Sequence, residues 1–133
     1  MQIRHSSFTF HRHSLIEADL LSHNDIFIQL AACSFDVHLW ELVDPLVIGA
    51  TVVMLPSDIQ MNVGCVINTI RQHQVTFLLL TPSYAVVFEQ YCDTRHEKES
   101  SLLTLRHVCS GGKKTFRYTN RTYSHVMPFI LYK

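Results

Sequence analysis

Four short apolar runs alternate with segments of helical periodicity, and this alternation limits the possible folds more than any other feature. Between the runs, apolar residues recur at spacings of three and four, as they do on one face of a helix. Short strands that alternate with helices of this kind are typical of a parallel sheet with crossover helices. The sequence therefore predicts an α/β fold with a parallel sheet of about four strands, at residues 26–33, 50–55, 75–80 and 102–109.

Residues with special backbone roles predict the helix boundaries within this pattern. Ser34 is the expected N-cap of the first helix, which Gly49 should end, and Asn62 is the expected N-cap of the next. Pro45 is expected to kink or restart the first helix, because proline has no backbone N–H to donate. The apolar face predicted for this helix consists of Val37, Trp40, Val43 and Val47.

The strand and helix pattern does not extend to either end of the chain. Residues 1–24 are rich in His, Ser and Phe, and they predict a poorly defined, solvated segment with a short helix at 15–21. Residues 25–112 are expected to form the folded domain. Residues 113–133 contain five basic and no acidic residues and have no clear period, which predicts a separate basic tail. Its apolar stretch, 127–132, has no expected partner.

Composition places the chain among globular proteins and excludes several kinds of partner. A length of 133 residues suits one domain, and 47% hydrophobic with 17% charged residues favours a packed core. Zero formal net charge predicts binding to neither nucleic acid nor an anionic membrane. The first residues lack a signal-peptide core and no apolar run approaches membrane-spanning length, so we expect a cytoplasmic protein. The four cysteines are far apart, which predicts buried reduced thiols and no metal site.

One carboxylate, Asp36, lies at the joint between the first predicted strand and its helix. Ligands of open α/β sheets bind at the carboxyl ends of strands, so this joint is a candidate site. Phe35 and Val37 flank Asp36, and a carboxylate held between apolar residues needs a cationic partner. The alternative is a structural role, in which Asp36 caps the helix and interacts with its dipole. Spacing alone leaves both alternatives open.

Several motifs occur in an order and spacing that match a known family. They are Phe35-Asp36-Val37-His38 with Trp40-Glu41-Leu42, then Gly49-Ala50-Thr51, Thr81-Pro82-Ser83 and Ser110-Gly111-Gly112. Over about residues 24–112 the chain resembles the adenylation domains of nonribosomal peptide synthetases, which are AMP-binding, adenylate-forming enzymes. The resemblance implies that residues 25–112 are a fragment of the large N-terminal subdomain of that fold. It also implies ATP-dependent activation of an amino acid and its transfer to a phosphopantetheine thiol.

The resemblance assigns roles to particular residues. Asp36 matches the family's Asp that pairs with the α-ammonium group of the substrate. The side-chain pocket would consist of Val37, Trp40, Leu79, Cys109 and Gly111, although all five also fit a plain core role. Such a lining implies a hydrophobic or aromatic amino acid, because a charged side chain would be desolvated without a partner. His38 replaces the commoner Ser of the motif and is expected at the surface or behind the residues that touch the substrate.

The resemblance also implies cofactors and partners that this sequence is not equipped to use alone. The family uses ATP with Mg²⁺, and its full-length members work with peptidyl carrier and condensation domains. The sequence contains no phosphate loop ending in Pro-Lys-Gly, no Tyr-Gly-Pro-Thr-Glu segment and no C-terminal subdomain with the catalytic lysine. Electrostatic stabilisation by such groups is usually the largest catalytic contribution. We therefore assign no catalytic residue and expect a fragment that binds ATP poorly and is inactive alone.

Two other functions remain open. An acyl-CoA synthetase-like ligase shares the fold but usually lacks an Asp at this joint, since a fatty or aryl acid has no ammonium group. A non-catalytic α/β binding module would fold stably and bind neither nucleotide nor amino acid.

Overall fold

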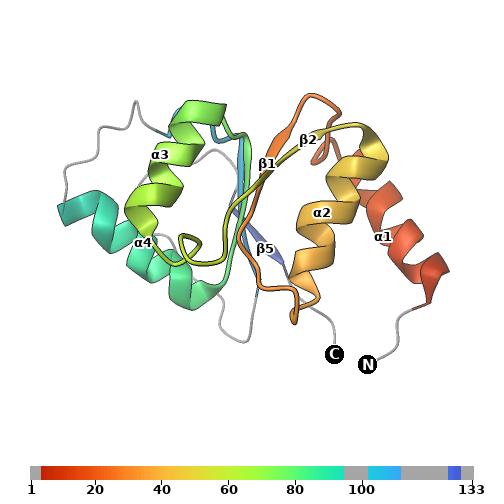
Figure 1. Ribbon diagram of the computed structural model, residues 1–133. Helices are drawn as coiled ribbons and strands as arrows, with labels where there is room; N and C mark the ends of the chain where they lie inside the picture. Colours follow the sequence, from red (N-terminus) through yellow and green to blue (C-terminus); the bar gives the residue numbers. More distant parts are fainter. Residues whose placement is uncertain (1–3, 95–101, 112–125, 130–133) are drawn as a thin grey trace.

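The computed structural model describes residues 4–94, 102–111 and 126–129, which form three layers (Figure 1). The middle layer is a five-stranded parallel sheet with the strand order β2-β1-β3-β4-β5. Its strands are β1 (Ile26–Gln29), β2 (Thr51–Met54), β3 (Phe77–Leu80), β4 (His107–Gly111) and β5 (Val126–Phe129). One face is covered by α1 (His5–Glu17) and α2 (Val37–Ile48), the other by α3 (Val63–His73) and α4 (Pro82–Thr94). The predicted α/β fold with a parallel sheet is confirmed.

The core is divided between the two faces of the sheet, because successive side chains of a strand point to opposite faces. Leu78 and Leu80 of β3 pack in the cluster that includes the buried residues of α3 and α4. Phe77 and Leu79 of the same strand pack in the cluster on the α1 and α2 side, where Phe77 stacks on Phe27 with the ring centroids 4.4 Å apart. All four residues of β3 are buried, as expected for the central strand of a parallel sheet.

Two of the predicted helix boundaries are confirmed. The side chain of Asn62 accepts a hydrogen bond from the backbone N–H of Cys65 (3.2 Å), which satisfies one of the free amides at the start of α3. Gly49 follows α2 with a φ of 77°, a left-handed conformation that glycine adopts at low cost. Pro45 lies inside α2, and the helix continues through it to Ile48 without restarting.

Several strands differ from the prediction in extent or burial. β1 ends at Gln29, because the next backbone amides donate to a side chain of α2. β4 begins at His107, since the preceding residues form a turn in which the N–H of Leu105 donates to the carbonyl of Leu102 (3.0 Å). The apolar run at 50–55 predicts a buried strand, but β2 is an edge strand and Met54 is 66% exposed.

Both ends of the chain contain elements that the sequence pattern did not predict. Helix α1 occupies His5–Glu17, where we expected a solvated segment with a short helix further along. Strand β5 pairs with β4 in parallel, from Val108 opposite Val126 to Gly111 opposite Phe129. The expectation that this apolar end has no partner is therefore wrong for the part within β5. Across the described ranges, no helix is both long and apolar enough to cross a membrane.

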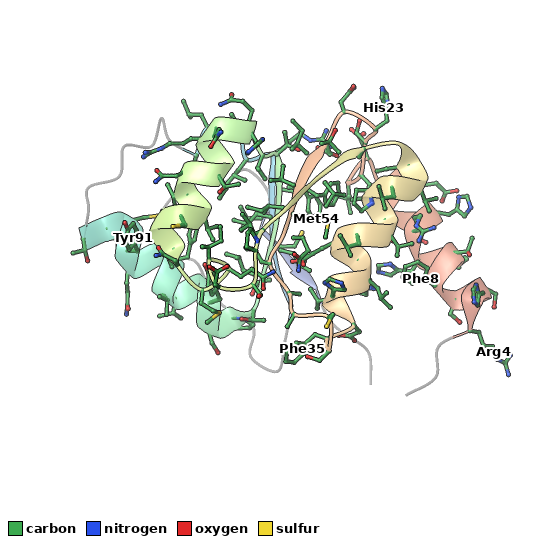
Figure 2. All side chains as sticks on the ribbon, in the orientation of Figure 1. Arg4, Phe8, His23, Phe35, Met54 and Tyr91 are labelled. Atoms are coloured by element: carbon green, nitrogen blue, oxygen red, sulfur yellow. The ribbon has the colours of Figure 1, made fainter. Side chains whose placement is uncertain are left out.

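Gly64 lies where α3 and α4 approach each other closely. A Cβ added there would lie 2.6 Å from Oη and 3.3 Å from Cζ of Tyr91, which extends from α4 (Figure 2). We expect Gly64→Ala to lower the free energy of unfolding by about 1–3 kcal/mol, the usual cost of overpacking. That cost should outweigh the roughly 1 kcal/mol that alanine gains in helix propensity. Urea unfolding measures the difference.

The control for this prediction is Tyr91→Phe, which removes the hydroxyl that the new methyl group would meet. Gly64→Ala should therefore cost less in the Tyr91→Phe background than in the natural chain. An equal cost in both backgrounds would show that the contact with Tyr91 is not the cause.

Candidate functional site

Asp36, the candidate ligand residue, lies in the turn between β1 and α2 at the carboxyl end of the sheet. Its Oδ1 accepts a hydrogen bond from the backbone N–H of Val37 (3.0 Å), which makes it the N-cap of α2. The prediction of Ser34 as the N-cap is therefore wrong. Asp36 is exposed, and the neighbouring Phe35 is 62% exposed at the outer end of the turn (Figure 2). The carboxylate is thus accessible to a cationic ligand and is not enclosed by apolar side chains of the described residues.

Three of the five predicted pocket residues come together on the sheet face that α2 covers. Leu79 and Cys109 lie opposite each other on β3 and β4, and both are buried. Val37, in the first turn of α2, packs against the same apolar cluster. Gly111 is the last residue of β4, so it lies at the carboxyl end of the sheet, as Asp36 does.

Trp40 lies between α1 and the sheet. Its ring stacks on His11 of α1, with the centroids 4.8 Å apart. It also lines a cavity of about 20 Å³ together with Leu79 and Phe77 of the sheet. Ligand pockets usually enclose several hundred Å³, whereas this cavity has room for a single water molecule. This small cavity beside Trp40 therefore would not accommodate an amino acid side chain.

Glu41 is a buried polar residue near the site for which the sequence predicts no role. It is 2% exposed, and its Oε2 accepts hydrogen bonds from the backbone N–H groups of Leu30 (3.0 Å) and Ala31 (2.7 Å). Burial raises the pKa of Glu41 from 4.5 to about 7, although the bonds from Ala31 and Leu30 lower it. The other oxygen, Oε1, is buried with no hydrogen-bond partner among the described residues.

Three further side chains complete the hydrogen bonds around this turn. Nδ1 of His38 lies 3.0 Å from the carbonyl oxygen of Ala31, which also accepts a bond from Nε2 of Gln29. Oε1 of Gln29 in turn accepts a bond from Nε2 of Gln60 (3.0 Å). His38 thus lies half-buried behind the turn and makes structural contacts, one of the two placements expected for it.

The buried face of α2 differs from the predicted apolar one. Its fully buried residues are Glu41, Asp44 and Pro45, whereas Val47 is 60% exposed. Asp44 is 4% exposed and pairs with Arg12 of α1, with Oδ1 and Nε 3.0 Å apart. Burial raises the pKa of Asp44, and the hydrogen bond and charge of Arg12 oppose that rise. A periodicity argument misses this face because both acids have partners on other elements.

The cysteines differ in their surroundings, and none forms a disulfide. Cys109 is buried, and the loss of hydration raises the pKa of its thiol to about 12. It therefore contributes a neutral, apolar surface to the cluster beneath Val37. Cys92 is also buried and Cys65 is half-buried, but Cys33 is exposed in the turn that precedes Asp36. The prediction of four buried thiols is wrong for Cys33.

The described residues lack two of the groups that commonly hold ATP and Mg²⁺. They contain no lysine, and no group of three or more His, Cys, Asp and Glu side chains among them is placed to hold a metal ion. Phosphate binding usually depends on lysine, arginine or a glycine-rich loop, and magnesium on carboxylates. What the site offers is one accessible carboxylate, Asp36, next in sequence to Val37, which packs against the apolar cluster that includes Leu79 and Cys109. That combination suits a ligand with a cationic group and an apolar part.

Comparisons with known proteins identify the family of this chain. The sequence model of the family described as "AMP-binding enzyme" matches residues 1–132, a longer stretch than the one that carries the motifs. Vanchrobactin synthetase VabF of Vibrio anguillarum is 31% identical over 93 residues, which cover 68% of this chain and 3% of VabF. Bacitracin synthase 2 of Bacillus licheniformis is 28% identical over 103 residues, which cover 77% of this chain and 4% of that protein.

Solved structures share the fold at low sequence identity. The nonribosomal peptide synthetase FmoA3 with AMPPNP bound superimposes with a TM-score of 0.68 at 22% identity, covering 77% of this chain and 11% of FmoA3. A second form of FmoA3 contains α-methyl-L-serine-AMP. NpsA-ThdA of Klebsiella oxytoca, an artificially fused adenylation and carrier (PCP) di-domain, gives a TM-score of 0.60 at 21% identity, covering 74% of this chain and 18% of the fusion. This chain therefore spans a small part of each of these proteins.

Proposed function

The chain belongs to the AMP-binding enzyme family, and from this membership we propose that it carries the amino-acid-recognition part of an adenylation domain of nonribosomal peptide synthesis. The observation that supports the proposal is the placement of Asp36. It presents an accessible carboxylate at the carboxyl end of the sheet, at the first turn of the helix whose Val37 packs with Leu79 and Cys109. Ligands of open α/β sheets bind at this end.

In the proposed complex, Asp36 pairs with the α-ammonium group of the amino acid. A charge-assisted hydrogen bond of this kind contributes about 1.5–3 kcal/mol. The apolar part of the substrate would lie toward Val37, Trp40, Leu79, Cys109 and Gly111. A hydrophobic or aromatic amino acid suits these residues, because a charged side chain would lose its hydration there without a partner.

The rest of the reaction requires groups outside the described residues. FmoA3 was solved with AMPPNP, and NpsA-ThdA carries a carrier domain. By family membership we propose ATP with Mg²⁺ as the activating cofactors, and a phosphopantetheine-bearing carrier domain and a condensation domain as partners of the whole enzyme. The described residues of this chain bind and orient the amino acid only.

We expect hydrophobic L-amino acids to raise the melting temperature of the 133-residue chain, because a ligand that binds only the folded state stabilises it. L-phenylalanine is the first probe, and 3-phenylpropanoate, which lacks the ammonium group, is the matched control ligand. Asp36→Ala should weaken L-phenylalanine binding by about 10- to 150-fold, since 1.4 kcal/mol corresponds to a factor of ten. Isothermal titration calorimetry measures the affinities.

Asp58→Ala provides the control variant, because Asp58 is also an exposed acid but lies in the loop after β2. Its affinity for L-phenylalanine should equal that of the natural chain. Equal binding of L-phenylalanine and 3-phenylpropanoate, or unchanged binding in Asp36→Ala, contradicts the proposed function.

A further inference from the structure

We propose that Glu41 is a positioning residue for Asp36: its buried carboxylate holds the turn between β1 and α2 in the shape that presents Asp36 to a ligand. The inference rests on the proposed function as far as the ligand is an amino acid. The placement of Asp36 itself is a property of the free chain and is tested separately below.

Glu41 accepts a pair of backbone hydrogen bonds at the end of β1. The β1–β2 ladder ends at Gln29, opposite Met54. The next two amides, of Leu30 and Ala31, donate to the same oxygen of Glu41. A buried backbone N–H without an acceptor is unfavourable, so this carboxylate determines the direction in which the chain leaves the sheet.

The path along the chain from these bonds to Asp36 is short. Only four residues separate Ala31 from Asp36, and the N–H of Phe35 closes a turn onto the carbonyl of Ala32 (3.0 Å). Glu41 itself is on α2, little more than one helical turn after its N-cap. Both ends of the turn are therefore attached to Glu41, one by hydrogen bonds and the other by the helix.

The two oxygens of the Glu41 carboxylate have different surroundings. Oε2 accepts both amide bonds, while Oε1 is buried with no hydrogen-bond partner among the described residues. An apolar side chain would fill the same space without desolvating a carboxylate, but it would leave both amides without an acceptor. The residue is thus suited to holding the two amides rather than to packing.

Several titratable groups surround Glu41 and bear on its protonation. His38 and Asp44 lie on α2 itself, and α1 contributes His11, which stacks on Trp40, and Arg12, which pairs with Asp44. From the sheet, Gln29 of β1 is polar and uncharged, and β3 contributes Phe77 and Leu79 to the shared cavity.

The sign of the pH effect follows from the raised pKa of Glu41, which is about 7 in the folded chain against an ordinary value of 4.5. The folded state therefore favours the protonated acid between these values, and its stabilising contribution is complete below pH 4.5. As the pH rises through 7, this contribution is lost and the ionised carboxylate becomes the stronger acceptor for the two amides. The amide signals should follow this change.

The experiment is a pH titration of the ¹⁵N-labelled 133-residue chain by NMR. We expect the amide shifts of Leu30 and Ala31 to titrate with a midpoint near pH 7. The amide of Val37, which donates to Oδ1 of Asp36, should titrate with the same midpoint. Leu30 and Ala31 titrating near pH 7 while Val37 stays constant would overturn the positioning role.

Glu41→Gln distinguishes an effect of Glu41 on the amide shifts from an effect of its neighbour His38. The amide carbonyl of glutamine still accepts both N–H bonds but does not titrate, and His38 is unchanged. The transition near pH 7 that the three amides share should therefore disappear in this variant, while the melting temperature changes little. A Val37 transition near pH 7 that survives in Glu41→Gln belongs to another group and overturns the proposal. Glu17→Gln, at an exposed position of α1, is the control and should titrate like the natural chain.

Glu41→Ala tests the consequence for binding. Where this variant folds by circular dichroism, L-phenylalanine should bind at least tenfold more weakly than to the natural chain, whereas Glu41→Gln should remain within about threefold. Binding by folded Glu41→Ala within twofold of the natural chain would contradict the inference. If the natural chain binds no amino acid, the proposed function fails, and the Val37 titration still decides whether Glu41 positions Asp36.

Discussion

Arg12→Ala is expected to lower the free energy of unfolding by about 3–5 kcal/mol, the usual cost of removing one partner from a buried ion pair. Arg12 and Asp44 are 8% and 4% exposed, so the variant would leave the Asp44 carboxylate buried without its cation. Arg12 also lies over the ring of Phe8, with Cζ 4.6 Å from the centroid. Urea unfolding at pH 7 measures the loss. The loss should shrink at lower pH, because Asp44 then becomes neutral by protonation.

Two variants make this expectation specific to the buried pair. Arg4→Ala removes an exposed arginine at the start of the same helix and should change stability by no more than about 0.5 kcal/mol. The double variant Arg12→Met with Asp44→Leu replaces the pair by apolar side chains and should recover most of the loss. A double variant as unstable as Arg12→Ala would contradict the argument from an uncompensated buried charge.

Leu78→Ala is the second variant with a large expected effect, a loss of about 2–5 kcal/mol. Leu78 is fully buried in the middle of the central strand, opposite Val108 of β4 and within the cluster that α3 and α4 cover. The variant loses the transfer free energy of the removed methyl groups and leaves a cavity that the surrounding strands and helices fill only in part. The free energy of unfolding in urea is again the measurement.

Leu103→Ala is the matched control for Leu78→Ala. It is the same substitution at a residue that is 76% exposed in the turn before β4, so it should change stability by no more than about 0.5 kcal/mol. Similar losses for the two variants would mean that the central strand is not buried as described.

The elements that sequence reasoning predicted correctly are those with a strong local signal. Helix α3 has its apolar residues at Val63, Val66, Ile67 and Ile70, all buried, and Asn62 and Gly49 have the capping roles expected of their residue types. The parallel arrangement followed from the alternation of strands and helices alone. Helix α1 was missed because its sequence carries little periodic signal and its one buried residue is the charged Arg12. Strand β5 was missed because four residues that include Pro128 give a weak strand pattern.

The candidate site was predictable in part. The motif located Asp36 at the carboxyl end of the sheet, and the structure brings Val37, Leu79 and Cys109 together beside it. The spacing left open whether Asp36 would cap α2, and the sequence did not predict that Trp40 would stack on His11. Both depend on how α2 is rotated about its axis and on the presence of α1 beside it, and neither is encoded in the spacing of the motif.

By itself, the sequence determined the fold class, the caps at Asn62 and Gly49 and the family resemblance, because each of these depends on residues close together in the chain. The tertiary structure alone decided which face of α2 is buried. Glu41 and Asp44 lie on that face because their partners, the amides after β1 and Arg12 of α1, come from other elements. Burying a carboxylate is unfavourable unless such partners are already in place. No local pattern contains that information, and the geometry around Asp36 depends on it.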